Sequence, residues 1–83
     1  MKIYGYEFSK EDVTKVINSL PRSFGHHNVE GKLKEMGVPV YIGVKYISSP
    51  LASRIIQKMA KQGRVKRIYG MGYNTIWELE VLV

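Results

Sequence analysis

The chain contains no cysteine and no long apolar run. Without cysteine among its 83 residues, neither a disulfide framework nor a thiolate metal site can stabilise the fold. The apolar stretches are short and interrupted, so no transmembrane helix is predicted. The first residues also lack the apolar block of a signal peptide. We therefore expect one small domain over residues 1–83 that is stabilised by packing and located in the cytoplasm.

Acidic residues are scarce in the second half of the chain. The net charge is +6, and residues 1–44 carry six basic and five acidic groups. Residues 45–83 carry seven basic groups and only Glu78 and Glu80, so Lys45 through Tyr73 contains no acidic residue. Such a one-sided field favours an anionic partner, and nucleic acid is the first candidate. An anionic membrane is the weaker alternative, because the basic groups are not confined to one amphipathic helix.

The patterns typical of catalytic, metal and cofactor sites are missing. His26 and His27 are adjacent, which suits one metal ion poorly, and we interpret them as a loop pair. Glu11 and Asp12 are helix-capping charges rather than the facing carboxylates of an acid–base pair. The Gly70-Met71-Gly72 run precedes a predicted strand, whereas a dinucleotide fingerprint opens a helix. We expect no enzyme, no metal, no cofactor and no small-molecule ligand.

The first twenty residues predict a strand and a helix. Residues 2–8 alternate loosely, with Tyr4, Tyr6 and Phe8 on one side of a short strand. Ser9 is a good N-cap for a helix that ends at Pro21, and the apolar residues between them follow helical spacing.

The middle of the chain predicts a loop, a helix and a less regular segment. Residues 21–27 are expected to form the loop, and a second helix covers about 28–36 before a stop at Gly37. Residues 38–47 are rich in β-branched and aromatic side chains, which fit either a short strand or an ordered apolar loop.

A third helix and a hairpin are predicted for the rest. Ser48-Ser49-Pro50 is typical of a capped helix start, and the helix covers 49–62 before Gly63. Its apolar face consists of Leu51, Ala52, Ile55, Ile56 and Met59. Residues 64–82 form a hairpin with its turn at 70–74. Alternation on the last strand places Trp77, Leu79, Val81 and Val83 inward and Ile76 and Leu82 outward.

Three helices followed by a hairpin resemble a winged helix-turn-helix DNA-binding domain. Residues 52–67 carry the resemblance: they are similar to a recognition helix that ends in Gly and leads into a basic strand. The resemblance implies an α+β fold, a three-helix winged helix-turn-helix with a C-terminal β-hairpin wing and a short N-terminal strand. One feature departs from it. A helix-turn-helix joins its helices by about 3–4 residues, whereas the connection from Gly37 to Ser48 is longer and apolar.

The resemblance also implies a role for each exposed residue of this segment. Helix 49–62 would enter the major groove of double-stranded DNA, with Arg54 suited to guanine and Gln57 to adenine. Lys58, Lys61, Lys66 and Arg67 would contact phosphates. Tyr73 lies near the wing tip. The complete predicted site is Ser49, Ser53, Arg54, Gln57, Lys58, Lys61, Lys66, Arg67 and Tyr73.

Several interpretations remain open at this stage. The first is a small transcriptional regulator of bacterial, archaeal or viral type, possible as a homodimer through either terminal strand. The alternative is a winged-helix protein-interaction module that docks an acidic protein surface, and RNA is a third partner that charge permits. A solvated amphipathic helix would show the same basic face without binding anything. The tyrosines and Trp77 are expected to be core or sheet-face residues rather than a base-stacking surface.

Overall fold

The computed structural model describes residues 1–80, apart from the side chain of Tyr73, as an α+β chain with three α-helices and antiparallel strands. The elements in chain order are β1 (Lys2–Ile3), β2 (Tyr6–Glu7), α1 (Lys10–Ser19), β3 (Ser23–Gly25), α2 (His26–Glu35), β4 (Tyr41–Ile42), β5 (Lys45–Tyr46), α3 (Ser48–Lys61), β6 (Val65–Tyr69), the 3-10 turn η1 (Gly72–Asn74) and β7 (Ile76–Leu79). Within residues 1–80, no helix has the length and apolarity needed to cross a membrane.

Helix α1 confirms the predicted first helix. The Ser9 side chain accepts a hydrogen bond from the backbone N–H of Asp12 at 3.1 Å, which satisfies one of the unpaired donors of the first turn. Val13, Val16 and Ile17 form its buried stripe. The Ser9 cap and the apolar spacing together therefore identified the helix, and the spacing identified the face that it buries.

Helices α2 and α3 end as predicted, each at a glycine. Gly37 and Gly63 have φ of +89° and +70°, a conformation that is easy only for glycine. After α2, the N–H of Gly37 donates to Lys34 and the N–H of Val38 to Leu33, which is the double hydrogen-bond pattern of a Schellman motif. The predicted apolar face of α3 is buried in full.

The start of α2 differs from the prediction by two residues. The helix begins at His26, because the Asn28 side chain accepts a hydrogen bond from the backbone N–H of Gly25 at 2.8 Å. Asn28 is therefore the third helical residue rather than the first. The neighbouring prediction of a loop over 21–27 is wrong in part, because Ser23–Gly25 forms strand β3.

A three-stranded antiparallel sheet in the order β3-β7-β6 closes one end of the fold. Its hairpin β6–β7 confirms the predicted C-terminal hairpin, and Phe24 of β3 pairs with Trp77 of β7. Ile76, predicted to point outward, is half-buried, and its side chain lies beside Gly25, its pairing partner in β3. The inward and outward positions predicted for residues 81–83 lie outside the described residues.

Two further hairpins replace single predicted segments. Residues 2–8 do not form one strand: β1 and β2 pair with each other through a turn in which Tyr4 and Gly5 have φ of +46° and +83°. Residues 38–47 form the hairpin β4–β5, which turns at Gly43 and belongs to neither of the other sheets. The long connection between α2 and α3 is therefore an ordered hairpin.

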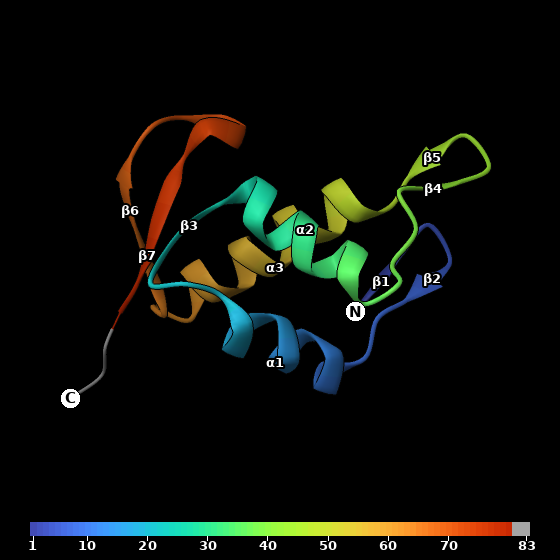
Figure 1. Ribbon diagram of the computed structural model, residues 1–83, viewed down its shortest axis with the longest axis horizontal. Coiled ribbons are helices and arrows are strands. Elements are labelled where there is room, and N and C mark those ends of the chain that lie inside the picture. The colour runs from blue at the N-terminus through green and yellow to red at the C-terminus, as the bar shows by residue number, and fades with distance from the viewer. Residues whose placement is uncertain (81–83) are drawn as a thin grey trace.

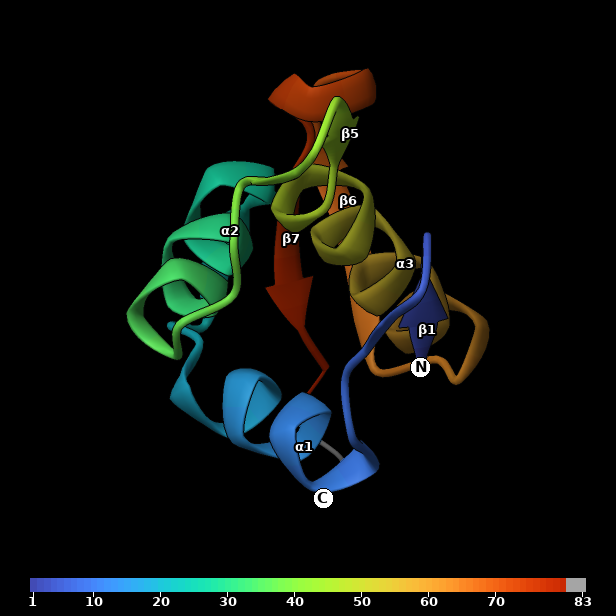
Figure 2. The ribbon, with the colours of Figure 1, turned by 90° about the vertical axis from the view of Figure 1, so that its right-hand side faces the viewer.

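The three hairpins lie at the two ends of an elongated molecule, whose longest extent is 41 Å. Figure 1 shows β6–β7 at one end and both β4–β5 and β1–β2 at the other, with the helices between them. Figure 2, viewed along the long axis, places η1 and β5 at the same edge of the molecule. The core packs between these layers and includes Phe24, Leu33, Ile47, Leu51, Ile55 and Met59.

Candidate nucleic-acid interface

Helix α3 presents one buried face and one polar face. Ser49, Ser53 and Gln57 follow one another at intervals of four residues and border the sheet side of the helix. Arg54, Lys58 and Lys61 form a second, cationic row. The two serines are half-buried, whereas the other four side chains are exposed. The helix thus brings six of the nine predicted residues onto one continuous surface.

Arg54 has a structural role that the sequence did not suggest. Its guanidinium Nη1 donates a hydrogen bond to the backbone carbonyl of Lys2 in β1 at 2.8 Å. This bond attaches the N-terminal hairpin to the cationic row. Because an arginine carries five N–H donors, the exposed guanidinium keeps donors for a ligand. Lys58 and Lys61 have no ion pair within residues 1–80.

The two predicted cations of β6 lie on opposite faces of the sheet. Lys66 is opposite Glu78 of β7, and the two side chains form an ion pair at 3.7 Å. Arg67 is opposite Trp77, on the face that packs toward α3. Arg67 has no ion pair among the described residues and lies on the sheet face that turns toward α3, whereas Lys66 lies on the other face.

An open cleft of about 250 Å³ lies between α3 and the β6–β7 hairpin. Its lining residues are His26, Ser53, Ile56, Gln57, Gly72 and Trp77. Ser53 and Gln57 of α3 therefore face the hairpin turn across this cleft. Tyr73 is in the same turn, but its side chain is outside the described part of the chain.

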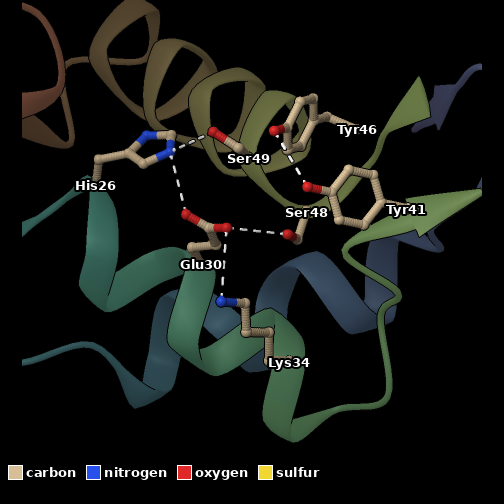
Figure 3. Close-up of polar contacts among 7 residues, drawn as sticks. All are labelled: His26, Glu30, Lys34, Tyr41, Tyr46, Ser48 and Ser49. Atoms are coloured by element: carbon tan, nitrogen blue, oxygen red, sulfur yellow. Dashed lines mark hydrogen bonds and ion pairs between the residues drawn. The ribbon is translucent and has the colours of Figure 1, made fainter. Parts of the chain in front are cut away.

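The first residues of α3 bind α2 rather than capping their own helix (Figure 3). Ser48 donates to Glu30 at 3.0 Å, and Ser49 is hydrogen-bonded to His26 Nε2 at 3.0 Å. Glu30 also lies 3.7 Å from His26 and 3.8 Å from Lys34. The predicted serine cap is therefore wrong: Ile47 is the N-cap residue, and no side chain caps the helix.

The interpretation of a histidine loop pair is wrong, because His26 and His27 are the first two residues of α2 and His26 is buried. Burial lowers the pKa of His26; the nearby Glu30 carboxylate raises it, and His27 lowers it further. His27 is exposed. Among residues 1–80 no cluster of histidine, cysteine, aspartate and glutamate could hold a metal ion.

The aromatic residues were expected to lie in the core or on sheet faces, and most of them are strand residues, namely Tyr6, Tyr41, Tyr46, Tyr69 and Trp77. Four tyrosines are exposed, namely Tyr4, Tyr41, Tyr46 and Tyr69, while Tyr6 and Trp77 are half-buried. The rings of Tyr41 and Tyr46 lie 4.6 Å apart, and the Tyr41 hydroxyl donates to that of Tyr46 at 3.1 Å. This hydrogen bond raises the pKa of Tyr41.

Sequence reasoning missed His26 and Trp77 as lining residues of the cleft. Only the pairing of β3 with β7 brings the start of α2 to the hairpin, and no short-range pattern signals that pairing. Comparison of the chain with protein-family models, curated proteins and solved structures finds no match. Function must therefore be inferred from the geometry of the chain itself.

Proposed function

We propose that this chain is a winged-helix DNA-binding protein in which α3 enters the major groove and the β6–β7 hairpin is the wing. The observation that carries the proposal is the continuous surface formed by the polar face of α3 and Arg67. This surface holds cations without ion pairs within residues 1–80, planar hydrogen-bonding groups and no acidic side chain. Such a mixture suits both phosphate contact and base readout.

The roles of individual residues follow from their positions. Gln57, exposed at the cleft, is best placed to read a base edge, and Ser49 and Ser53 are half-buried beside it. Lys58, Lys61 and Arg67 would contact phosphates. Arg54 would serve both the DNA and the anchor of the N-terminal hairpin. Lys66 has the weakest support, because Glu78 neutralises it on the other face of the sheet.

A small transcriptional regulator is the function that suits such a domain. A single DNA-binding module buries only about 600–1,000 Å² of protein surface, so binding by one copy would be weak. A homodimer would double the contact area and read two half-sites. Either terminal strand is the proposed dimer contact.

The test is a gel-shift assay with mixed genomic duplex fragments at two salt concentrations. We expect a shift at low salt that weakens at high salt, with a loss of sequence preference in Gln57→Ala. Competition with duplex RNA distinguishes the RNA alternative. The absence of any shift at low salt would reject DNA binding and favour the module that docks an acidic protein surface.

A further inference from the structure

The β4–β5 hairpin exposes a concentration of apolar side chains that the DNA proposal does not use. Val44 at its tip is 90% exposed, and Tyr41, Ile42 and Tyr46 are each about half exposed. Lys45 is the only charged residue between Glu35 and Arg54. Its Nζ lies 5.2 Å from the centre of the Tyr4 ring, and it forms no ion pair within residues 1–80.

The hairpin is held in a fixed place despite its two-residue strands. Short isolated hairpins are only marginally stable in water. Here the paired rings of Tyr41 and Tyr46 brace the two strands, and the N–H of Ile47 donates to the carbonyl of Val40 at 2.8 Å to close the base. The next residue, Ser48, begins α3 and is hydrogen-bonded to Glu30 (Figure 3). The hairpin therefore has a defined position relative to α3.

Its position mirrors that of the proposed wing. The two hairpins lie at opposite ends of the long axis but at the same edge of the molecule (Figures 1 and 2). The molecule is 41 Å long, and one turn of B-DNA is about 34–36 Å. Two minor grooves that flank one major groove are separated by one such turn. A chain of this length can reach both of them.

The exposed apolar area of the hairpin is too small for a separate interface but is sufficient to enlarge a neighbouring one. If each side chain presents roughly 200 Å² in full, its four apolar side chains expose roughly 500 Å². A stable protein interface needs about 800 Å² from each partner. The hairpin alone is too small for that, and its one charge is positive. An anionic duplex that already contacts α3 supplies the missing area and the opposite charge.

We propose that the β4–β5 hairpin is a second DNA-contacting element, with Lys45 at a phosphate and Val44 against the minor groove, on the side of α3 opposite the wing. This inference rests on the proposed function. Apolar residues and cations are the groups that minor-groove elements commonly use. Met71, 80% exposed beyond β6, gives the wing a comparable apolar tip.

The test compares duplexes of 8 and 16 base pairs, bound by the intact chain and by Val44→Ser/Lys45→Ala. The 8-base-pair duplex, roughly 27 Å long, is too short to reach both hairpins. On the 16-base-pair duplex we expect the variant to lower the slope of log affinity against log salt by about 0.9. On the 8-base-pair duplex we expect no change. Lys10→Ala, which removes one exposed cation from α1, is the matched control and should change neither slope.

Three outcomes would overturn the inference, and they are distinguishable. If both proteins bind the longer duplex with the same slope, the hairpin does not contact DNA, while the proposed function stands. If sedimentation shows that the variant is a monomer whereas the intact chain is a dimer, and the difference in slope is absent, the hairpin is a contact between copies of the chain. If the intact chain binds neither duplex, the proposed function fails as well. Equal melting temperatures of the variants would show that the fold is preserved.

Discussion

Removing single lysines at two exposed positions tests which cations contact DNA. Lys61 lies on the cationic row of α3, whereas Lys66 is paired with Glu78 on the opposite face of the sheet. Both side chains are exposed, so neither substitution by alanine disturbs the core. The two variants change the net charge equally. Any difference between them therefore reports position rather than total charge.

The magnitude follows from the number of cations on the proposed surface. Lys58, Lys61 and Arg67 are the proposed phosphate contacts on it, and each neutralised phosphate contributes about −0.9 to the slope of log affinity against log salt, which gives about −2.7. Affinity should then fall about 40-fold between 50 and 200 mM salt. Lys61→Ala should reduce the slope to about −1.8, which corresponds to a fall of about 12-fold. Contact by Lys45 would add one further increment to all of these slopes.

Fluorescence anisotropy with a labelled 16-base-pair duplex at four or five salt concentrations measures these slopes. Lys66→Ala should retain the slope of the unmodified chain, because its side chain is already neutralised away from the surface. Equal slopes for the two variants would contradict the claim that Lys61 contacts DNA whereas Lys66 does not. A slope of the unmodified chain close to zero would refute electrostatic contact with DNA altogether.

Three further predictions concern the stability of the fold. Burial lowers the pKa of His26, so the unfolded state takes up a proton on this side chain at a higher pH than the folded state does. The stability that neutral His26 contributes is therefore present above about pH 6.5 and is lost as the pH falls below that value. His26→Gln should flatten the dependence of melting temperature on pH between pH 7.5 and 5.5. Ser48→Ala removes a hydrogen bond to the charged, half-buried Glu30 and should lower the free energy of unfolding, measured in urea, by about 1.5–3 kcal/mol. A decrease below about 0.5 kcal/mol would contradict that hydrogen bond. Gly70→Ala should lower the melting temperature more than Gly72→Ala does. A Cβ at Gly70 would collide with the backbone of η1, whereas a Cβ at Gly72 would meet no atom within 4 Å. Equal melting temperatures of the two variants would contradict this geometry.

The parts of the fold that depend on local pattern were predicted well. The Ser9 cap, the two glycine stops and the buried stripe of α3 each follow from residues within one or two helical turns of one another. Local backbone preference and apolar spacing are sufficient for such features. The order of three helices and a hairpin was predictable for the same reason.

The errors arose where distant contacts override local pattern. Strand β3 has only three residues and depends on pairing with β7, more than fifty residues later in the chain. Ser48 and Ser49 look like helix caps, but α2 offers them a carboxylate and an imidazole. Tyr41 and Tyr46 lie in a segment for which a single strand or a loop was predicted, yet they pair with each other across a hairpin. None of these partners can be inferred from neighbouring residues.

The candidate site was predictable as a set of residues but not as a geometry. The spacing of α3 correctly placed its polar residues on one side. Strand alternation already places Lys66 and Arg67 on opposite faces, but the sequence could not show which of them faces α3, or that Arg54 binds the carbonyl of Lys2. Both features change which residues best report DNA contact.

The most direct test of the central proposal is a titration of the ¹⁵N-labelled chain with a 16-base-pair duplex, followed by NMR. The account predicts that chemical-shift changes concentrate on the polar face of α3 and on the β6–β7 hairpin, with Gln57, Lys61 and Arg67 among the affected residues. Helix α1, which lies outside this surface, should show little change. Shift changes centred on α1, or no changes at low salt, would contradict the account.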